Sequence, residues 1–305
     1  MIKDIKRDSL TELSNLESLF NNLKESLIDP LARDIANEVN WVYLKNISKD
    51  KYEKYPIAIT GEGSPVLLLH GFDSSFLEFR RLVPLLKKNH KLIIPDMFGF
   101  GFCPRPIDGE YGKEGLIRHL IEVLNQLTNK NQIGLIGASM GGGVAMELAK
   151  RCPNKFNRLL LLAPAGLTGK PTPLPPLIDK LGVWFLSQPI VRKGLCRQAF
   201  AFPDKNVGKA EEQIASLHLS VPGWGNSLAA FARKGDVANC GNPIPPQKIK
   251  ILLGRRDRIL NNSVKKEILD LLGQRAKEIK DCGHLPHIDC PQEVANEWLE
   301  IHNFK

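Results

Sequence analysis

The sequence predicts an α/β fold: a mostly parallel sheet with helices on both faces and a helical segment inserted late in the sheet. Between residues 66 and 163, short apolar runs alternate with segments whose apolar residues recur at helical spacing. This alternation is typical of strand–helix–strand units, in which helices cover both faces of parallel strands. A proline-rich stretch, 169–176, then interrupts the pattern, and helical pieces continue to about Cys240 before two further strands.

The expected elements follow from these patterns. Strands are expected where short apolar or β-branched runs end in glycine, proline or polar residues. Helices are expected over 76–87, 113–127 and 142–150, where apolar residues recur every three or four positions. The expected strands are 39–44, 55–60, 66–70, 91–95, 132–136, 158–163, 249–254 and 276–280.

The N-terminal region, residues 10–37, also carries apolar side chains at helical spacing, with an interruption at Pro30. We expect a helical extension that lies outside the sheet. Its expected role is to cover a surface of the core or to bind a partner.

Residues 137–141 read Gly-Ala-Ser-Met-Gly and come directly after the apolar strand 132–136. The pattern G-x-S-x-G between a strand and a helix is typical of a nucleophile elbow, a strained turn that exposes a serine. The helix that follows begins beside Ser139, so its free N–H groups and dipole favour negative charge there. The pattern therefore predicts Ser139 as a nucleophile.

Three further polar sites follow strands at the same expected edge of the sheet. His70-Gly71-Phe72 ends the strand that begins at Pro65, Asp257 follows the strand 249–254, and His284 follows the strand 276–280. Ligands of open α/β sheets bind at the carboxyl ends of strands. The order serine, aspartate, histidine along the chain differs from the orders of the chymotrypsin and subtilisin triads.

With these motifs, the chain resembles the α/β-hydrolase superfamily from about Pro56 to its C-terminus. The resemblance implies that Ser139 is the nucleophile, His284 its general base, and Asp257 the acid that orients His284. It also implies that the backbone N–H groups of Phe72 and Met140 form the oxyanion hole. The motifs that carry the resemblance are His70-Gly71-Phe72, Pro95-Asp96-Met97-Phe98-Gly99-Phe100-Gly101, Gly137 to Gly141, Gly254 to Asp257 and Gly283-His284-Leu285-Pro286.

The resemblance also assigns domains. It implies an N-terminal helical extension over 1–38, an α/β core over 39–166 and 241–305, and a helical cap, or lid, over 167–240. The cap contains several aromatic residues, some of which should line an apolar pocket above Ser139. Trp184, Phe185 and Trp224 are the expected substrate-binding residues.

Other candidate residues receive structural roles. His287 competes with His284 as the base, but the Gly-His-x-Pro context favours His284, and His287 is expected to be a packing or surface residue. The resemblance gives His70 a role in shaping the oxyanion loop and makes Asp96 structural. The remaining histidines are expected at the surface or at helix caps: His90, His119, His218 and His302.

The composition limits the partners. The chain of 305 residues has 42 Lys+Arg against 33 Asp+Glu, a formal net charge of +9, and residues 167–256 hold 13 against 5. Without a compact basic run with interleaved aromatic residues, we expect no nucleic acid. A solvated basic face, an anionic substrate and a peripheral membrane contact stay open as explanations.

The six cysteines form no C-x-x-C pair and have no zinc spacing, so no metal is expected. Scattered thiols fit a reducing compartment. The N-terminus lacks a signal-peptide pattern, and no apolar stretch is long enough to span a membrane. We therefore expect a cytoplasmic protein without a cofactor.

The expected activity is that of a serine hydrolase that forms an acyl-serine intermediate. Its expected substrate is a small molecule, a carboxylic ester of medium size with a partly apolar acyl group. A serine at the elbow argues against haloalkane dehalogenases and epoxide hydrolases of the superfamily, which use aspartate there. A C–C bond hydrolase of a dienoate or diketone, a thioesterase and a cofactor-free perhydrolase stay open, since all share the elbow. A non-catalytic protein that binds a ligand or partner is the alternative from another class.

Overall fold

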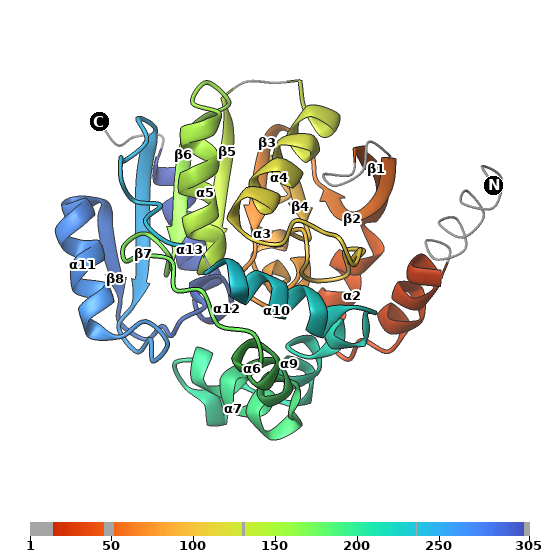
Figure 1. Cartoon of the computed structure of the whole chain (residues 1–305). Coiled ribbons are helices and arrows are strands. Elements are labelled where there is room, and N and C mark those ends of the chain that lie inside the picture. The colour runs from red at the N-terminus through yellow and green to blue at the C-terminus, as the bar shows by residue number, and fades with distance from the viewer. Residues whose placement is uncertain (1–14, 46–51, 130–131, 236, 302–305) are drawn as a thin grey trace.

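The computed structural model describes residues 15–45, 52–129, 132–235 and 237–301. Its eight-stranded sheet has the order β1-β2-β4-β3-β5-β6-β7-β8 (Figure 1). β2 pairs antiparallel with both β1 and β4, and all other neighbouring strands are parallel, so the predicted mostly parallel sheet is confirmed. The strands are β1 (Val39–Lys45), β2 (Tyr52–Thr60), β3 (Ser64–Leu69), β4 (His90–Pro95), β5 (Ile133–Ala138), β6 (Phe156–Leu162), β7 (Lys248–Gly254) and β8 (Ala276–Ile279).

Helices cover both faces of this sheet. Residues 15–25 form the first described helix, and 3-10 turns occur at Phe76–Phe79, Leu217–Ser220 and Gly273–Arg275. The other α-helices are α2 (Pro30–Asn37), α3 (Val83–Leu86), α4 (Lys113–Leu127), α5 (Met140–Arg151), α6 (Ile178–Ser187), α7 (Pro189–Ala199), α8 (Pro203–Asn206), α9 (Lys209–Ile214), α10 (Trp224–Lys234), α11 (Asn262–Leu272), α12 (Pro286–Asp289) and α13 (Pro291–Glu300).

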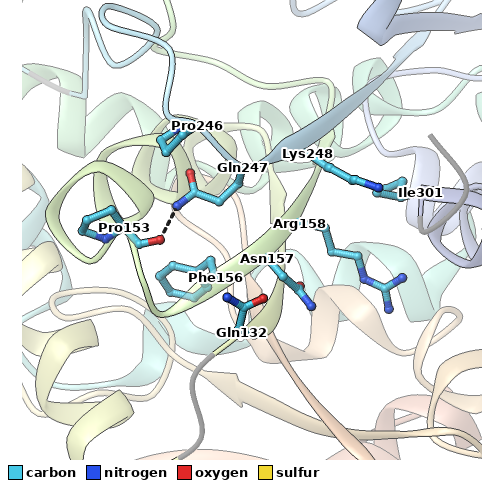
Figure 2. A pocket seen from close by; sticks show the side chains of 9 residues that line it. All are labelled: Gln132, Pro153, Phe156, Asn157, Arg158, Pro246, Gln247, Lys248 and Ile301. Atoms are coloured by element: carbon cyan, nitrogen blue, oxygen red, sulfur yellow. Dashed lines mark hydrogen bonds between the residues drawn. The ribbon is translucent and has the colours of Figure 1, made fainter. Parts of the chain in front are cut away.

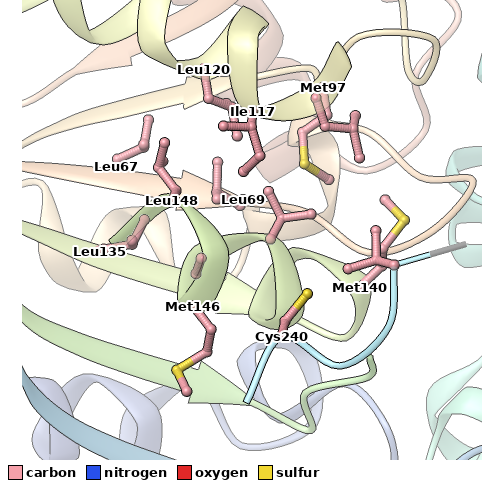
Figure 3. Close-up of a cluster of buried hydrophobic side chains, with 14 of the residues drawn as sticks. Leu67, Leu69, Met97, Ile117, Leu120, Leu135, Met140, Met146, Leu148 and Cys240 are labelled. Atoms are coloured by element: carbon pink, nitrogen blue, oxygen red, sulfur yellow. The ribbon is translucent and has the colours of Figure 1, made fainter. Parts of the chain in front are cut away.

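The central strands are buried on both faces, because successive side chains point to opposite sides. Leu67 and Leu69 of β3 pack with α4 and α5, whereas Val66 and Leu68 pack with the helix 15–25, α2, α3 and α13. Figure 3 shows the first of these clusters between β3, β5, α4 and α5. This arrangement explains why these strands read as continuous apolar runs.

The segment predicted as one helix over 76–87 is instead split. It forms a 3-10 turn at Phe76–Phe79 and the short helix α3. Pro84 lies in the first turn of α3, where proline is tolerated because its missing N–H would have no helical partner. The prediction of a single helix was therefore wrong.

The N-terminal helices pack onto the core. Phe20, which is 3% exposed, contacts the rings of Trp41, Phe76 and Phe102 at centroid distances of 6.0, 6.0 and 5.1 Å. Asp29 caps α2 by accepting the Leu31 N–H. The predicted helical extension thus covers the core over its described part, and its residues 1–14 lie outside the described residues.

The helices α6 to α10 come between β6 and β7. Figure 1 shows them beyond the ends of the central strands, at the end where α5 begins. This segment corresponds to the predicted cap 167–240, whose boundaries stay a prediction. Within the described residues, no helix combines the length and the apolar character needed to cross a bilayer.

Candidate active site

Ser139 lies on a strained turn between β5 and α5. Its φ of 49° and ψ of −120° are unusual for a residue with a side chain. Its N–H donates to the Leu162 carbonyl of β6 at 2.9 Å, and its carbonyl accepts the N–H groups of Gly142 and Ala165. Backbone hydrogen bonds on both sides thus hold the serine in a conformation that would otherwise be sparsely populated.

The glycines that flank Ser139 are required by space. A Cβ at Gly141 would lie 2.3 Å from the Leu69 carbonyl oxygen and 2.5 Å from that of His70. A Cβ at Gly137 would lie 2.3 Å from the Gly141 oxygen. The G-x-S-x-G pattern therefore reflects close backbone contacts between the elbow and the end of β3.

The side chains of Ser139, His284 and Asp257 come from three separate strand ends, and His284 contacts both of the others. The His284 Nε2 lies 2.9 Å from the Ser139 Oγ, and the His284 Nδ1 lies 2.9 Å from the Asp257 Oδ2. With the Nδ1 proton donated to Asp257, the Nε2 of a neutral imidazole can accept the serine hydroxyl proton. This is the arrangement of nucleophile, base and orienting acid that activates a serine.

Asp257 is held in place on three sides. Its Oδ1 accepts the N–H groups of Ile259 and Leu260, at 2.8 and 3.0 Å. Burial raises the pKa of Asp257, but the contacts with His284 and these N–H groups outweigh it, and the net pKa is lowered. Asp257 is thus ionised near neutral pH. The buried Lys265 Nζ donates to the carbonyls of Gly254 and Asp257 and fixes the turn.

The loop that carries His284 is fastened to α7. The His284 N–H donates to the Ala199 carbonyl at 2.8 Å, and the Gly283 N–H donates to Asp289. A Cβ at Gly283 would lie 2.5 Å from the same Ala199 oxygen. The last turn of α7 therefore positions the proposed base.

The loop after β3 lies beside Ser139 and is held by two buried side chains. The His70 Nδ1 donates to the Gly71 carbonyl at 2.7 Å, and its Nε2 accepts the Met97 N–H at 3.0 Å. Burial lowers the pKa of His70 to about 4, which keeps this ring neutral. Glu78 accepts the Gly71 N–H, at 3.2 Å from its Oε2.

Asp73, at the end of this loop, is the centre of a buried network that sequence reasoning missed. It accepts hydrogen bonds from Arg192 of α7, from His218 at 2.9 Å and from Trp224 of α10 at 2.8 Å. Burial raises the pKa of Asp73, but His218, Arg192 and Trp224 outweigh it and lower the pKa to about 2. The network ties the loop beside Ser139 to the helices that cover it.

Several predicted placements of histidines are wrong. His90, His119 and His218 are buried, not at the surface or at caps, and His302 lies outside the described residues. His287 is also fully buried, so the packing role is the one that the structure supports. Its Nε2 lies 3.0 Å from Glu78.

A cavity of about 290 Å³ opens beside Ser139 and His284. Trp184 and Phe185 are 60% and 53% exposed, and neither lines it. Trp224 is buried and also lies outside the lining. A substrate role for these three aromatic residues stays a prediction. The apolar wall comes from α6, α7, α12 and several loops, and consists of Phe72, Leu186, Leu195, Cys196, Ala199, Phe200, Ala215, Ile259, Leu285 and Ile288.

Charged side chains also reach this cavity. Asp73, Glu78 and Glu211 supply three carboxylates, and Arg80 and Arg192 supply two guanidinium groups. Arg80 contacts Asp29 at 2.6 Å and Glu211 at 3.3 Å, and Arg192 pairs with Asp73. Both arginines of the cavity are therefore neutralised by carboxylates of the protein.

A second cavity, of about 410 Å³, lies at the opposite ends of β6 and β7 (Figure 2). Its described lining includes Asn157, Arg158 and Gln247 but no serine, cysteine or histidine. It therefore lacks the nucleophile and base that the first cavity has.

Asp96 has the structural role that the resemblance implied. Its two oxygens accept the N–H groups of Phe76 and Phe102, at 2.7 and 2.6 Å. Burial raises the pKa of Asp96 to about 7. Across the described part of the chain, no cluster of His, Cys, Asp or Glu side chains could hold a metal ion.

Proteins similar in sequence include several hydrolases. A 2-hydroxymuconate semialdehyde hydrolase of Pseudomonas sp. (strain CF600) is 29% identical over 252 residues, 78% of this chain and 86% of the relative. Lipase 3 of Moraxella sp. (strain TA144) is 33% identical over 255 residues, 79% of this chain and 77% of the lipase. The two relatives thus carry the names of different hydrolases.

Solved structures share the fold. A meta-cleavage product hydrolase from Pseudomonas fluorescens IP01 superposes with a TM-score of 0.71 at 22% identity, over 88% of this chain and 98% of that protein. An esterase from Exiguobacterium antarcticum gives a TM-score of 0.70 at 21% identity, over 87% and 100%. The sequence model of the alpha/beta hydrolase family matches residues 66–297. With the fold and this match, the chain belongs to the α/β-hydrolase family.

Proposed function

We propose that this protein is a serine hydrolase that cleaves a neutral carboxylic ester through an acyl-serine intermediate. The observation that carries the proposal is the continuous relay of Ser139, His284 and Asp257, with two contacts of 2.9 Å. A merely structural serine would need neither a buried base nor an orienting carboxylate.

The proposed mechanism assigns one step to each group. Ser139 attacks the ester carbonyl while the His284 Nε2 takes its proton, and Asp257 stabilises the imidazolium that forms. His284 then protonates the leaving alcohol and later activates a water that releases the acid. The Met140 N–H, at the first residue of α5, and the Phe72 N–H are the proposed oxyanion donors. Each such donor contributes about 3–4 kcal/mol elsewhere.

The charge balance of the cavity supports a neutral substrate. Its two arginines are already paired with Asp29, Asp73 and Glu211, and Glu78 adds a further carboxylate. A substrate carboxylate would have to compete with these acids in a site of low dielectric. The apolar wall formed by α6 and α7 favours an acyl chain, and we propose these helices as part of a lid.

Hydrolysis of a C–C bond is the second candidate. It is supported by the likeness to the Pseudomonas 2-hydroxymuconate semialdehyde hydrolase over 78% of this chain. The same triad could serve it, because the chemistry again begins at a carbonyl group. A thioester substrate, a perhydrolase activity and a role in ligand binding without turnover have no comparable feature in the described residues.

Hydrolysis of p-nitrophenyl esters from acetate to palmitate tests the proposal. We expect turnover that is lost in Ser139→Ala and retained in Ser263→Ala, which changes an exposed serine of α11. The acyl-chain length that gives the highest kcat/KM then indicates the size of the cavity. Turnover of 2-hydroxymuconate semialdehyde without turnover of any ester would contradict ester hydrolysis and support the second candidate.

A further inference from the structure

The outward face of α6 is apolar. Its exposed residues lie at positions 177 and 178, 181, and 184 and 185, groups that follow one another at intervals of three or four, so they share one side of the helix. Lys180 is the polar residue beside them. The exposed apolar residues, with their exposed fractions, are Leu177 (76%), Ile178 (54%), Leu181 (64%), Trp184 (60%) and Phe185 (53%).

The inward face of the same helix is fixed to the protein. Asp179 is buried and pairs with Arg233 of α10. Val183 packs against Gly225 of α10, and Leu186 lines the cavity beside Ser139. The apolar side chains on the opposite face are thus held outward by a helix that is itself anchored. A contiguous apolar surface of this kind is unusual for a monomer in water.

The exposed charges next to α6 in the sequence are basic. Residues 167–201 contain five Lys+Arg and one Asp+Glu, and three of the five cations, Arg192, Lys193 and Arg197, pair with Asp73, Glu212 and Asp204. Lys170 and Lys180 are exposed, and the one acid, Asp179, is neutralised by Arg233. Trp, Phe and Leu on one face with lysines beside them are typical of helices that lie in the interface of an anionic bilayer.

We propose that α6 docks this protein on an anionic lipid bilayer, with Leu177, Leu181, Trp184 and Phe185 inserted among the headgroups. The ten residues of α6 span about 15 Å, too short to cross a bilayer but suited to lying in its surface. Since Leu186 on the inner face lines the cavity, a docked α6 places the catalytic cavity close to substrates dissolved in lipid.

The charge distribution favours a bilayer over a second copy of the chain. In a symmetric dimer built on α6, Lys170 and Lys180 of one copy would lie near the same lysines of the other. Like charges brought together across an interface oppose association. Anionic headgroups, in contrast, would attract the same lysines, and added salt would weaken that attraction.

Vesicle flotation tests the docking and does not depend on the proposed activity. We expect the full chain to float with vesicles of phosphatidylcholine and phosphatidylglycerol, and less with phosphatidylcholine alone or at high salt. Leu181→Glu should lower the partition coefficient by about tenfold or more, because a charge replaces a leucine that would be buried in the bilayer.

Leu299→Glu is the matched control, since Leu299 of α13 is a leucine of similar exposure (51%) on a helix outside this face. It should bind vesicles like the unchanged protein. The blue shift of tryptophan emission on binding should be lost in Trp184→Phe, because the other tryptophans do not belong to the face.

Three outcomes would overturn the docking: no flotation with anionic vesicles, equal loss in Leu181→Glu and Leu299→Glu, or a dimer in solution that Leu181→Glu dissociates. The last result would assign the face to a second copy of the chain.

Discussion

At the residue scale, Asp73 connects the proposed active site to the covering helices. It adjoins Phe72, a proposed oxyanion donor, and accepts hydrogen bonds from Arg192, His218 and Trp224. Asp73 is buried, and its backbone φ is 48°. Its surroundings must therefore hold it in this sparsely populated conformation. A buried charge with three donors is costly to disturb, because each donor then loses its partner.

Asp73→Asn should therefore destabilise the fold by about 3–5 kcal/mol, since it leaves the buried Arg192 without a counter-charge. Urea unfolding measures this loss. Asp204→Asn, at an exposed Asp that pairs with Arg197, is the control and should leave the unfolding midpoint unchanged. Equal midpoints for both variants would contradict the role given to the network.

At the element scale, the elbow depends on contact between the backbones of α5 and β3. Gly141 sits where any side chain would meet the carbonyl oxygens of Leu69 and His70. The backbone there cannot move without shifting Ser139 itself. By contrast, the space around Gly182 in α6 is open.

Gly141→Ala should lower both stability and turnover, because the new Cβ would lie 2.3 Å from a carbonyl oxygen. Gly182→Ala is the matched change in an open helical position and should raise stability by up to about 1 kcal/mol. Thermal unfolding of the two variants compares them. A Gly141→Ala protein with normal stability and kcat would contradict the close contact between Gly141 and the Leu69 carbonyl.

The helix 15–25 is the second element whose packing can be tested. Phe20→Ala removes a buried ring that touches three aromatic residues, and should cost about 3–5 kcal/mol. Phe185→Ala, at an exposed ring of α6, should change the free energy of unfolding by less than about 0.5 kcal/mol. If the two losses are equal, the helix is not part of the core and fits a partner-binding arm.

At the scale of the whole molecule, buried histidines set the response to pH. Burial lowers the pKa of His70 and His119 to about 4 and also lowers that of His218. Burial raises the pKa of Asp96 to about 7, which acts in the opposite direction. The lowered pKa values of the three histidines outweigh the raised pKa of the one aspartate. Between about pH 4 and 6.5, the unfolded chain therefore binds more protons than the folded chain.

Stability should thus be highest above pH 6.5, the ordinary histidine value, and should decrease as the pH falls toward 4. Below that, Asp73 and Glu78, whose pKa values are about 2, add a further loss. Unfolding midpoints in urea across this range measure the slope, and His119→Gln should flatten it. A midpoint that rises on acidification would contradict the assignment of neutral buried histidines.

The sequence patterns predicted the central strands, the elbow and the order of the three polar residues, because each depends on neighbours in the chain. The positions of Ser139, Asp257 and His284 at strand ends follow from parallel topology. The partners of Asp73 are separated from it by 119 to 151 positions in the sequence. No local sequence pattern could therefore predict this network. Nor can helical spacing alone tell the inner from the outer face of α6, where Trp184 and Phe185 point outward.

The most direct test of the central claim is to trap the acyl-enzyme. A p-nitrophenyl ester is mixed with the protein, the reaction is quenched in acid, and peptide mass spectrometry locates the acyl group. An acyl adduct on Ser139 that forms with the burst of p-nitrophenolate, and is absent from Ser139→Ala, is the predicted result. Ester turnover that persists in Ser139→Ala, or an adduct on another residue, would contradict a serine nucleophile at the elbow.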